Sequence, residues 1–99
     1  MSVRLSDRAQ ADLVEIWDYS AKQWGIDQAD RYIDALMTRF GWLSGNAALW
    51  KPRSDLAEGL YSYPQQGHTI YFRAFADASD VIEIVRVLHG RMEPAGHVG

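Results

Sequence analysis

The stretch SAKQWGIDQADRYIDAL, residues 20–36, contains the junction between two predicted helices. Gly25 interrupts two amphipathic patterns, and glycine is typical of the position just after a helix end. Asp27 restarts the helical pattern, with Asp30 three positions later as an approximate capping box. Because the link is only two or three residues long, we predict that the helices pack against each other as an antiparallel hairpin.

Apolar residues on both sides of this junction recur at spacings of three and four, which predicts one buried face on each helix. Ser6 or Asp7 offers an N-cap for the first helix. The first stripe comprises Ala9, Leu13, Ile16, Trp17, Ser20 and Trp24. The second comprises Ala29, Ile33, Leu36, Phe40 and Leu43, is widened by Tyr32 and Met37, and ends at Gly45 and Asn46. We expect the helices to meet through Leu13, Ile16, Trp17, Ile33, Leu36 and Phe40.

The rest of the chain shows the two-residue period of strands. Strands are predicted at residues 2–6, 60–64, 68–75 and 81–89, with Pro64 stopping the second. Gln66-Gly67 predicts a hairpin turn with glycine at positive φ, residues 77–80 predict another turn, and residues 46–59 a loop with room for one helical turn. The order βααβββ predicts one α+β domain over residues 1–99, with the helical hairpin on one face of an antiparallel sheet.

Composition limits the classes of function. The chain has 99 residues, a formal charge of −3 and no cysteine. The absence of cysteine excludes disulfides and thiolate nucleophiles, and it suits a reducing compartment. The negative charge argues against nucleic-acid binding through bulk electrostatics. No signal-peptide h-region and no long apolar run is present, so we predict a cytoplasmic protein that does not span a membrane.

Strand parity separates the side chains of the predicted sheet into two faces. Ile70, Phe72 and Ala74 are expected beneath the helices, together with Val81, Val85 and Val87. The opposite face would hold Tyr71, Arg73, Phe75, Ile82, Ile84, Arg86 and Leu88. This face is apolar with embedded arginines, and the predicted domain has no third layer to cover it. Such a surface is typical of a binding site.

The polar residues of the last strands allow a catalytic interpretation. Arg73, Arg86, His89 and Arg91 are suitable types for a metal-free ribonuclease, because imidazole titrates near neutrality and guanidinium groups stabilise a phosphorane. Four common residues are not a motif, however. His89 differs in parity from Arg86, so it also fits a residue that only ends the strand.

Other interpretations of these residues remain open. Arg73 and Arg86 would equally suit carboxylates of a partner or the chain's own Asp55, Glu58 or Glu83. No metal or cofactor is predicted, because His68, His89 and His97 share no ligand spacing. Trp50, beside Lys51-Pro52-Arg53, is a candidate contact residue.

Four segments together resemble the ParE toxin family, part of the RelE/ParE superfamily of bacterial type II toxin–antitoxin modules. They are LSDRAQADLVEIWDYSAKQWG (5–25), ADRYIDAL (29–36), GLYSYPQQGHTIYFRAF (59–75) and VIEIVRVLHGRME (81–93). The resemblance covers nearly the whole chain, and its most specific parts are Asp12-Leu13 with Ile16-Trp17 and the ending IVRVLHGRM. It implies the same βααβββ order.

The resemblance also implies a cytoplasmic toxin neutralised by a ParD-like antitoxin. ParE-like members poison DNA gyrase by binding, whereas RelE-like members cleave ribosome-bound mRNA with a basic cluster and a Tyr or His near the end of the last strand. Lysine occurs here only at positions 22 and 51, which favours the gyrase branch. A non-toxic corepressor is a third alternative. Sequence-specific nucleic-acid binding is not expected.

The expected site residues follow from the open face and the resemblance. Antitoxin contacts are predicted at Tyr71, Arg73, Phe75, Ile84, Arg86 and Trp50. No catalytic residue is predicted for a gyrase poison. In the ribonuclease alternative the catalytic groups would be Arg73, Arg86 and His89.

Overall fold

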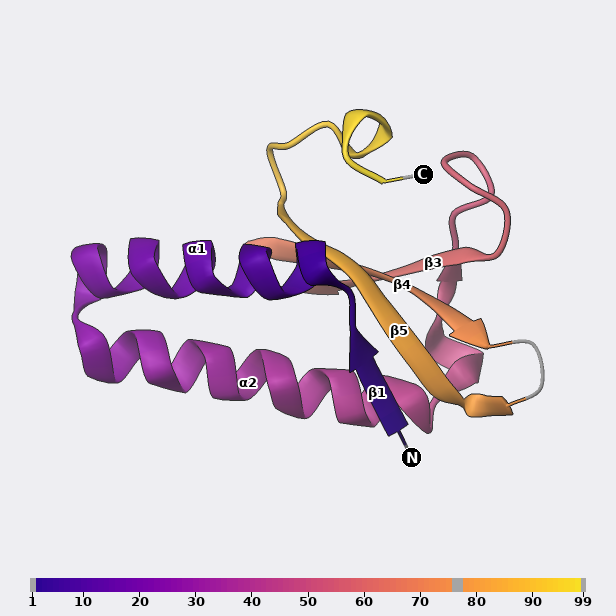
Figure 1. Cartoon of the computed structure of the whole chain (residues 1–99), viewed down its shortest axis with the longest axis horizontal. Helices are drawn as coiled ribbons and strands as arrows, with labels where there is room; N and C mark the ends of the chain where they lie inside the picture. Colours follow the sequence, from indigo (N-terminus) through magenta and orange to yellow (C-terminus); the bar gives the residue numbers. More distant parts are fainter. Residues whose placement is uncertain (1, 76–77, 99) are drawn as a thin grey trace.

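The computed structural model describes residues 2–75 and 78–98. The elements are β1 (Ser2–Leu5), α1 (Asp7–Trp24), α2 (Ile26–Ser44), the short 3₁₀ helix η1 (Ala47–Leu49), β2 (Lys51–Pro52), β3 (Leu60–Gln65), β4 (His68–Phe75), β5 (Ala78–His89) and η2 (Pro94–Gly96) (Figure 1). The predicted α+β class is confirmed. Neither helix of the described residues is long and apolar enough to cross a membrane.

Two parts of the element prediction need correction. The predicted loop of residues 46–59 contains one helical turn, η1, as the prediction allowed, but it also contains the short strand β2. Strand β5 begins at Ala78, so most of the turn predicted at residues 77–80 is strand, while Asp77 lies outside the described residues. The small and polar residues of this segment are typical of a turn. The start of β5 nevertheless pairs with β4, with Ala78 opposite Phe75, and is therefore extended.

The sheet is mixed, with strand order β1-β5-β4-β3-β2. Neighbouring strands are antiparallel except β1, which pairs parallel to β5 with Val3 opposite Ile82. The prediction of a purely antiparallel sheet is therefore wrong for this one pair. Alternation along a four-residue strand predicts which side chains share a face, but it carries no information about the partner strand or its direction.

The helical hairpin forms as predicted. The Ser6 side chain accepts a hydrogen bond from the Ala9 N–H at 3.0 Å and caps α1. Gly25, with φ of 94°, ends α1 and precedes α2, which begins at Ile26. Only glycine adopts this backbone conformation readily. The helices therefore run antiparallel side by side, and the Gly25 end projects beyond the strands (Figure 1).

A bulge in β5 changes which side chains face the helices. Tyr71 pairs with Arg86 and Phe72 pairs with Ile84, so Val85 is one residue in excess. Each extra residue reverses the alternation of side chains beyond it. The prediction that Ile84 lies on the open face is wrong, because Ile84 is fully buried beneath the helices. The prediction that Ile82 lies on the open face is wrong for the same reason, because Ile82 also belongs to the buried core beneath the helices.

The main core lies between the hairpin and the sheet. Its buried members are Ala9, Ile16, Leu36, Phe40, Leu43, Ile70, Phe72, Ile82, Ile84 and Val87. Leu13 and Ile33 pack against it partly buried, so the predicted helix contact is largely confirmed. Trp17 is the exception. It is half-buried outside this cluster, and its Nε1–H donates to Asp30 Oδ1 at 2.8 Å across the two helices.

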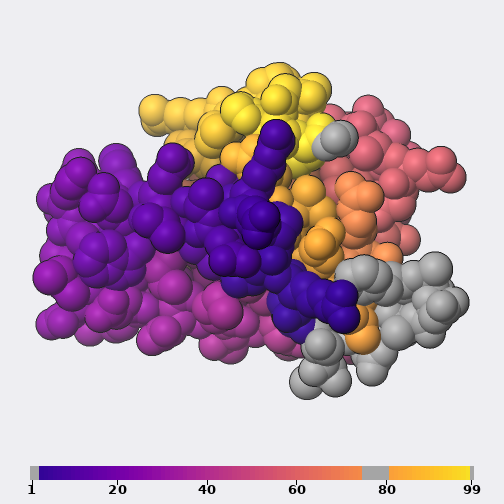
Figure 2. All heavy atoms as spheres, viewed as in Figure 1, coloured from indigo at the N-terminus to yellow at the C-terminus, as the bar shows by residue number. Residues whose placement is uncertain are grey.

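The opposite face of the sheet is covered by the chain itself. Leu60, Tyr71, Leu88 and Val98 form a second buried cluster, against which Leu56, Ala57 and Val85 pack. Figure 2 shows the C-terminal segment, in yellow, lying on this upper side of the molecule next to the loop after β2. The prediction of an uncovered face is therefore wrong, because the loop and the C-terminal segment supply a partial third layer.

One turn differs in detail from its prediction. The β3–β4 hairpin turn lies at Gln66-Gly67 as expected, but Gln66 takes the positive φ, at 50°. The length of the loop was predictable from the flanking strands. The distribution of backbone angles within the loop was not.

Candidate functional site

The first turns of α1 occupy the edge of β5 that β1 leaves unpaired. The Ser6 N–H donates to the Ile84 carbonyl at 3.0 Å, and the Ser6 hydroxyl donates to the Val85 carbonyl at 2.8 Å. Six residues further along, Asp12 Oδ2 accepts a hydrogen bond from the Val87 N–H at 2.9 Å. Buried backbone groups need such partners. Ser6, the N-cap of α1, and Asp12 within α1 therefore supply partners to this edge of β5 and fix α1 against it.

Asp12 also binds Arg86. Arg86 Nε and Nη2 each donate to an oxygen of the Asp12 carboxylate at 2.8 Å, and Nη1 donates to the His97 carbonyl at 3.1 Å. The hydrogen bonds to Asp12 raise the pKa of Arg86 above its ordinary value. Both side chains are largely buried, and a two-point contact of this kind fixes orientation.

This pair corrects the sequence interpretation of Arg86. The carboxylate that binds Arg86 is that of Asp12, 74 residues away, and not that of Asp55, Glu58 or Glu83. Asp55 instead accepts two hydrogen bonds from Arg53 at 3.1 Å. The sequence offered one indication of a role for Asp12, because this charged residue stands directly beside the apolar stripe of α1.

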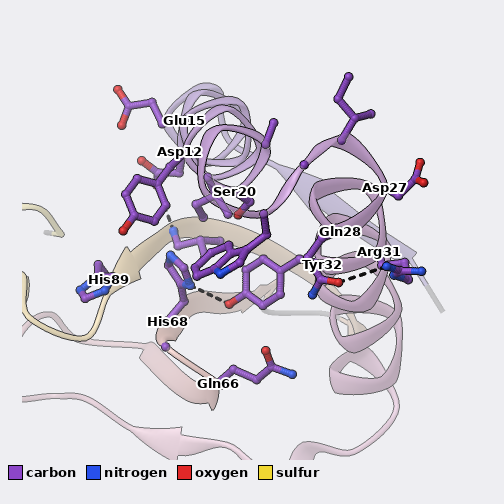
Figure 3. A pocket seen from close by; sticks show the side chains of 18 of the residues that line it. Asp12, Glu15, Ser20, Asp27, Gln28, Arg31, Tyr32, Gln66, His68 and His89 are labelled. Atoms are coloured by element: carbon purple, nitrogen blue, oxygen red, sulfur yellow. Dashed lines mark hydrogen bonds between the residues drawn. The ribbon is translucent and has the colours of Figure 1, made fainter.

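A broad cleft of about 1460 Å³ lies beneath the projecting end of the hairpin. One wall is formed by the facing sides of α1 and α2, and the other by the β3–β4 turn and the end of β5 (Figure 3). Met92 also lines the cleft. The lining includes Asp12, Glu15, Tyr19, Ser20, Trp24, Ile26, Asp27, Arg31, Tyr32, Gln66, His68, Arg86, His89 and Met92. The cleft therefore joins an exposed apolar region to a partly buried polar one.

The Tyr32–His68 pair forms the polar floor of the cleft. Tyr32 Oη lies 2.6 Å from His68 Nδ1 and 3.3 Å from the Gln65 carbonyl oxygen. Figure 3 shows the two side chains directed toward each other, one from α2 and one from the start of β4. Burial raises the pKa of Tyr32. Burial and the charge of His89 lower the pKa of His68, which favours its neutral form, while Asp12 opposes that shift.

His89 lies beside His68 at the end of β5. The two imidazole rings meet edge to face, with centroids 5.5 Å apart. His89 is exposed, and its Nδ1 accepts a hydrogen bond from the Arg91 N–H at 3.2 Å. The strand ends at His89 as predicted. His68 entered the sequence interpretation only as a rejected metal ligand, although the pairing of β4 with β5 brings it opposite His89.

Of the residues of the ribonuclease interpretation, Arg86 and His89 line the same cleft, whereas Arg73 lies away from them. Arg73 pairs with Glu83 in the register, whereas His89 pairs with His68. His68 and Arg73 are separated along β4 by five residues, about 17 Å at about 3.4 Å per residue. Arg86 is engaged by Asp12. Within residues 2–75 and 78–98, no three His, Cys, Asp or Glu side chains come together as a metal ion would require.

The residues predicted for antitoxin contact differ in their exposure. Ile84 is fully buried and Tyr71 is 4% exposed. Trp50 is half-buried, and its Nε1–H donates to the Leu43 carbonyl at 2.8 Å. Arg73 is exposed. The side chain of Phe75 lies outside the described residues.

Comparison with known proteins explains this arrangement of elements. Residues 3–94 match the family described as "ParE toxin of type II toxin-antitoxin system, parDE". The chain belongs to the ParE toxin family. This ParE-family chain is 33% identical over 96 residues to Toxin ParE1 of Caulobacter vibrioides, covering 97% of the chain and 96% of that relative. It is 34% identical over 89 residues to Toxin ParE1 of Mycobacterium tuberculosis, covering 90% of the chain and 89% of the relative.

Solved structures share the fold of this ParE-family toxin. A chain from the structure titled "Chromosomal ParDE TA system from P. aeruginosa" superposes with a TM-score of 0.74 at 21% identity, covering 90% of this chain and 95% of that one. A chain of the toxin–antitoxin complex RelBE2 from Mycobacterium tuberculosis superposes with a TM-score of 0.67 at 21% identity, covering 89% and 95%. The protein is thus a type II toxin–antitoxin toxin of the ParE family.

Proposed function

We propose that this toxin acts by binding and poisoning DNA gyrase, and that a ParD-like antitoxin holds it inactive. The family description names the parDE system, and one structural neighbour is itself titled as a ParDE system. These names support an antitoxin partner for this chain. Gyrase as the target rests on the resemblance to the ParE branch and on the chemistry of the site.

The observation that carries the proposal is that neither Arg73 nor Arg86 offers an uncompensated positive charge beside His89. A metal-free ribonuclease needs cations where negative charge develops and an acid–base group beside them. Here Arg86 is engaged by Asp12, and Arg73 lies about 17 Å along β4 from the histidines. The chain also has a charge of −3. This arrangement favours action through binding over RNA cleavage.

Among the predicted antitoxin contacts, Arg73 fits the proposal best. Of the five whose side chains are described, only that of Arg73 is exposed. We therefore keep Arg73 as a proposed contact on the sheet. Contact with Ile84 would require the core to open, and contact with Tyr71 would require the covering loop or C-terminal segment to move.

Assays of the purified toxin test the target directly. We expect it to inhibit supercoiling by gyrase and to increase cleaved DNA, and we expect the antitoxin to suppress both effects. mRNA bound to translating ribosomes should stay intact. His89→Gln should retain most of the toxicity, because removal of a true acid–base catalyst would cost about 10²–10⁴ in rate.

The two alternatives give different results in the same assays. Cleavage of ribosome-bound mRNA that His89→Gln abolishes in a folded protein would support the RelE-like alternative. A chain that affects neither growth nor gyrase, yet binds its antitoxin, would fit the corepressor.

A further inference from the structure

The C-terminal segment, residues 91–98, lies on the sheet as a separate piece of chain. It leaves β5 after His89 and turns back over the second face of the sheet (Figures 1 and 2). Within this segment Val98 is buried, at 8% exposure, in the second buried cluster. Arg86 Nη1 donates to the His97 carbonyl at 3.1 Å. One apolar side chain and one hydrogen bond thus fix the far end of the segment to the sheet.

The far end of the segment also forms hydrogen bonds within itself. The N–H groups of His97 and Val98 both donate to the Pro94 carbonyl, at 2.9 and 3.0 Å. These bonds stay intact if the segment moves off the sheet as a unit. Release therefore removes the Val98 contact and the Arg86 bond, and the freed polar groups meet water. Segments held by so few buried contacts open more readily than the core.

The loop of residues 53–59, the other cover of this face, is held more firmly. The Arg53 N–H donates to the Leu60 carbonyl at 2.8 Å, which continues the pairing of β2 with β3. The Arg53 guanidinium lies 5.8 Å from the centre of the Tyr71 ring, and Leu56 packs against the cluster. Of the two covers, the C-terminal segment is therefore the one that can leave while the sheet stays intact.

Arg86 connects the C-terminal segment to the helical hairpin. Its guanidinium is planar, with Nε and Nη2 bonded to the Asp12 carboxylate and Nη1 bonded to the His97 carbonyl. The orientation that Asp12 imposes therefore also places the donor for His97. The same carboxylate accepts the Val87 N–H. Because these contacts share one rigid group, docking of the segment and the hold of Asp12 on β5 favour each other.

We propose that the C-terminal segment is a releasable strap with a docked and a released position, and that Arg86 links its position to the contact between α1 and β5. The docked strap covers the second buried cluster, which includes Tyr71. Release opens this cluster and loosens the pair of Arg86 with Asp12. Arg86 and Met92, a residue of the strap, also line the cleft beneath the hairpin. Release therefore changes the lining of that cleft as well.

The strap goes beyond the proposed function, because neither gyrase nor an antitoxin enters the inference. The family match covers residues 3–94. It therefore includes the sheet but not His97 and Val98, the two residues that anchor the strap. The strap determines when Tyr71, which is 4% exposed in the docked position, becomes accessible to another molecule.

Proteolysis measures the released position. Trypsin cleaves after Arg91, which is exposed at the start of the strap, and cleavage reports how often the flanking chain opens. Wild-type toxin, Val98→Asp and the control Ala95→Asp are digested with limiting trypsin, and mass spectrometry follows the loss of residues 92–99. Ala95 is exposed in the strap, so its variant adds the same charge outside the cluster.

The two variants should differ clearly in this assay. We expect cleavage after Arg91 to be about 10-fold faster in Val98→Asp, because loss of one buried aliphatic contact shifts an opening equilibrium by about this factor. Ala95→Asp should stay within about twofold of wild type, as is usual for a surface substitution.

Hydrogen exchange, followed by NMR, measures the link to the hairpin. The Val87 amide donates to Asp12 and reports on that contact, whereas the amide of Leu36, fully buried in α2, reports on opening of the whole domain. In Val98→Asp we expect the Val87 amide to exchange about fivefold faster, the size expected when one hydrogen bond is weakened. The Leu36 amide should keep its wild-type rate, and Ala95→Asp should change neither rate.

Three results would overturn the inference. Equal cleavage of Val98→Asp and Ala95→Asp would mean that Val98 does not hold the strap. Faster cleavage with an unchanged Val87 amide would mean that the strap opens without any link to the hairpin. An equal rise at Val87 and Leu36 would mean that Val98 supports the whole domain, so that residues 91–98 are part of the core and not a strap.

Discussion

The base and the tip of the helical hairpin have the same amphipathic pattern but different surroundings. At the base, Ile16 and Phe40 are buried against the sheet. At the tip, Trp24 and Ile26 border an open cleft. The difference arises because the sheet ends at the β3–β4 turn and the helices extend further (Figure 1). An apolar stripe thus indicates what a helix can bury, and the length of the sheet determines how much it buries within one chain.

The largest effect is expected at the base. Phe40 is 1% exposed at the centre of the main core. Phe40→Ala should lower the free energy of unfolding by about 3–5 kcal/mol, because it removes apolar burial and leaves a cavity. Urea unfolding monitored by circular dichroism measures this loss. A loss below about 1 kcal/mol would mean that the base is as loosely packed as the tip.

Asp12→Ala should have the next largest effect. It leaves the Arg86 guanidinium largely buried without its carboxylate and the Val87 N–H without its acceptor. Removing one partner of a buried ion pair typically costs about 3–5 kcal/mol. We expect the lower end of that range, because Arg86 keeps its bond to the His97 carbonyl.

A double-mutant cycle separates this pair from general packing. Arg86→Met alone should also destabilise the protein, and the double variant Asp12→Ala with Arg86→Met should be less destabilised than the two single losses combined. Full additivity would show that Asp12 and Arg86 do not stabilise the base through their mutual contact.

Much of the hairpin could be predicted from the sequence, because its signals are local. Gly25 marks the junction and Ser6 caps the first helix, and both are confirmed. Helical spacing also identified Leu36 and Phe40 as core residues. These features depend on backbone conformation and periodicity within a few residues, so one sequence contains enough information to place them.

The site was less predictable, because it depends on contacts between distant segments. The extra residue at Val85 moves Ile82 and Ile84 from the predicted open face of the sheet to the face beneath the helices. Nothing in a run of Val and Ile marks a bulge. The Asp12–Arg86 pair spans 74 residues. The covering of the second face by Val98 depends on a tail that has no periodic pattern. Such features follow from three-dimensional register and not from local propensity.

Trp17 lies between the two regions, and its substitution should have an intermediate effect. The indole is half-buried and bonds Asp30 at 2.8 Å across the hairpin. Trp17→Ala should cost about 1–2 kcal/mol, from partial apolar burial and one exposed hydrogen bond. Thermal unfolding compares it with Phe40→Ala. A loss equal to that of Phe40→Ala would place Trp17 in the core after all.

The pH dependence of stability should be smaller and should come from His68, at the floor of the cleft. Its pKa is lowered from 6.5 in the folded protein, chiefly by burial. The unfolded chain therefore binds the proton more readily. Stability from this group is present above about pH 6.5 and is lost as the pH falls through the lowered pKa. Urea unfolding at pH 7.5, 6.5 and 5.5 should show this decline.

A matched pair of variants assigns the decline to its residue. His68→Gln should flatten the pH dependence, while His89→Gln should keep most of it, because burial of His68, the larger cause of its lowered pKa, remains. An unchanged slope in His68→Gln would mean that another group is responsible.

The smallest effect on stability is expected at the tip, where it distinguishes recognition from folding. Trp24 is 65% exposed and its main ring contact is with Tyr19, itself 60% exposed. Trp24→Ala should change the free energy of unfolding by less than about 0.5 kcal/mol, as is usual for surface substitutions, and alanine also favours the helix. Equilibrium unfolding of the isolated toxin checks this value. A loss above about 1 kcal/mol would show that the tip is held by its own packing, and the contrast with the base would disappear. A small loss combined with weakened antitoxin binding would instead mean that this large side chain is retained for contact with another molecule.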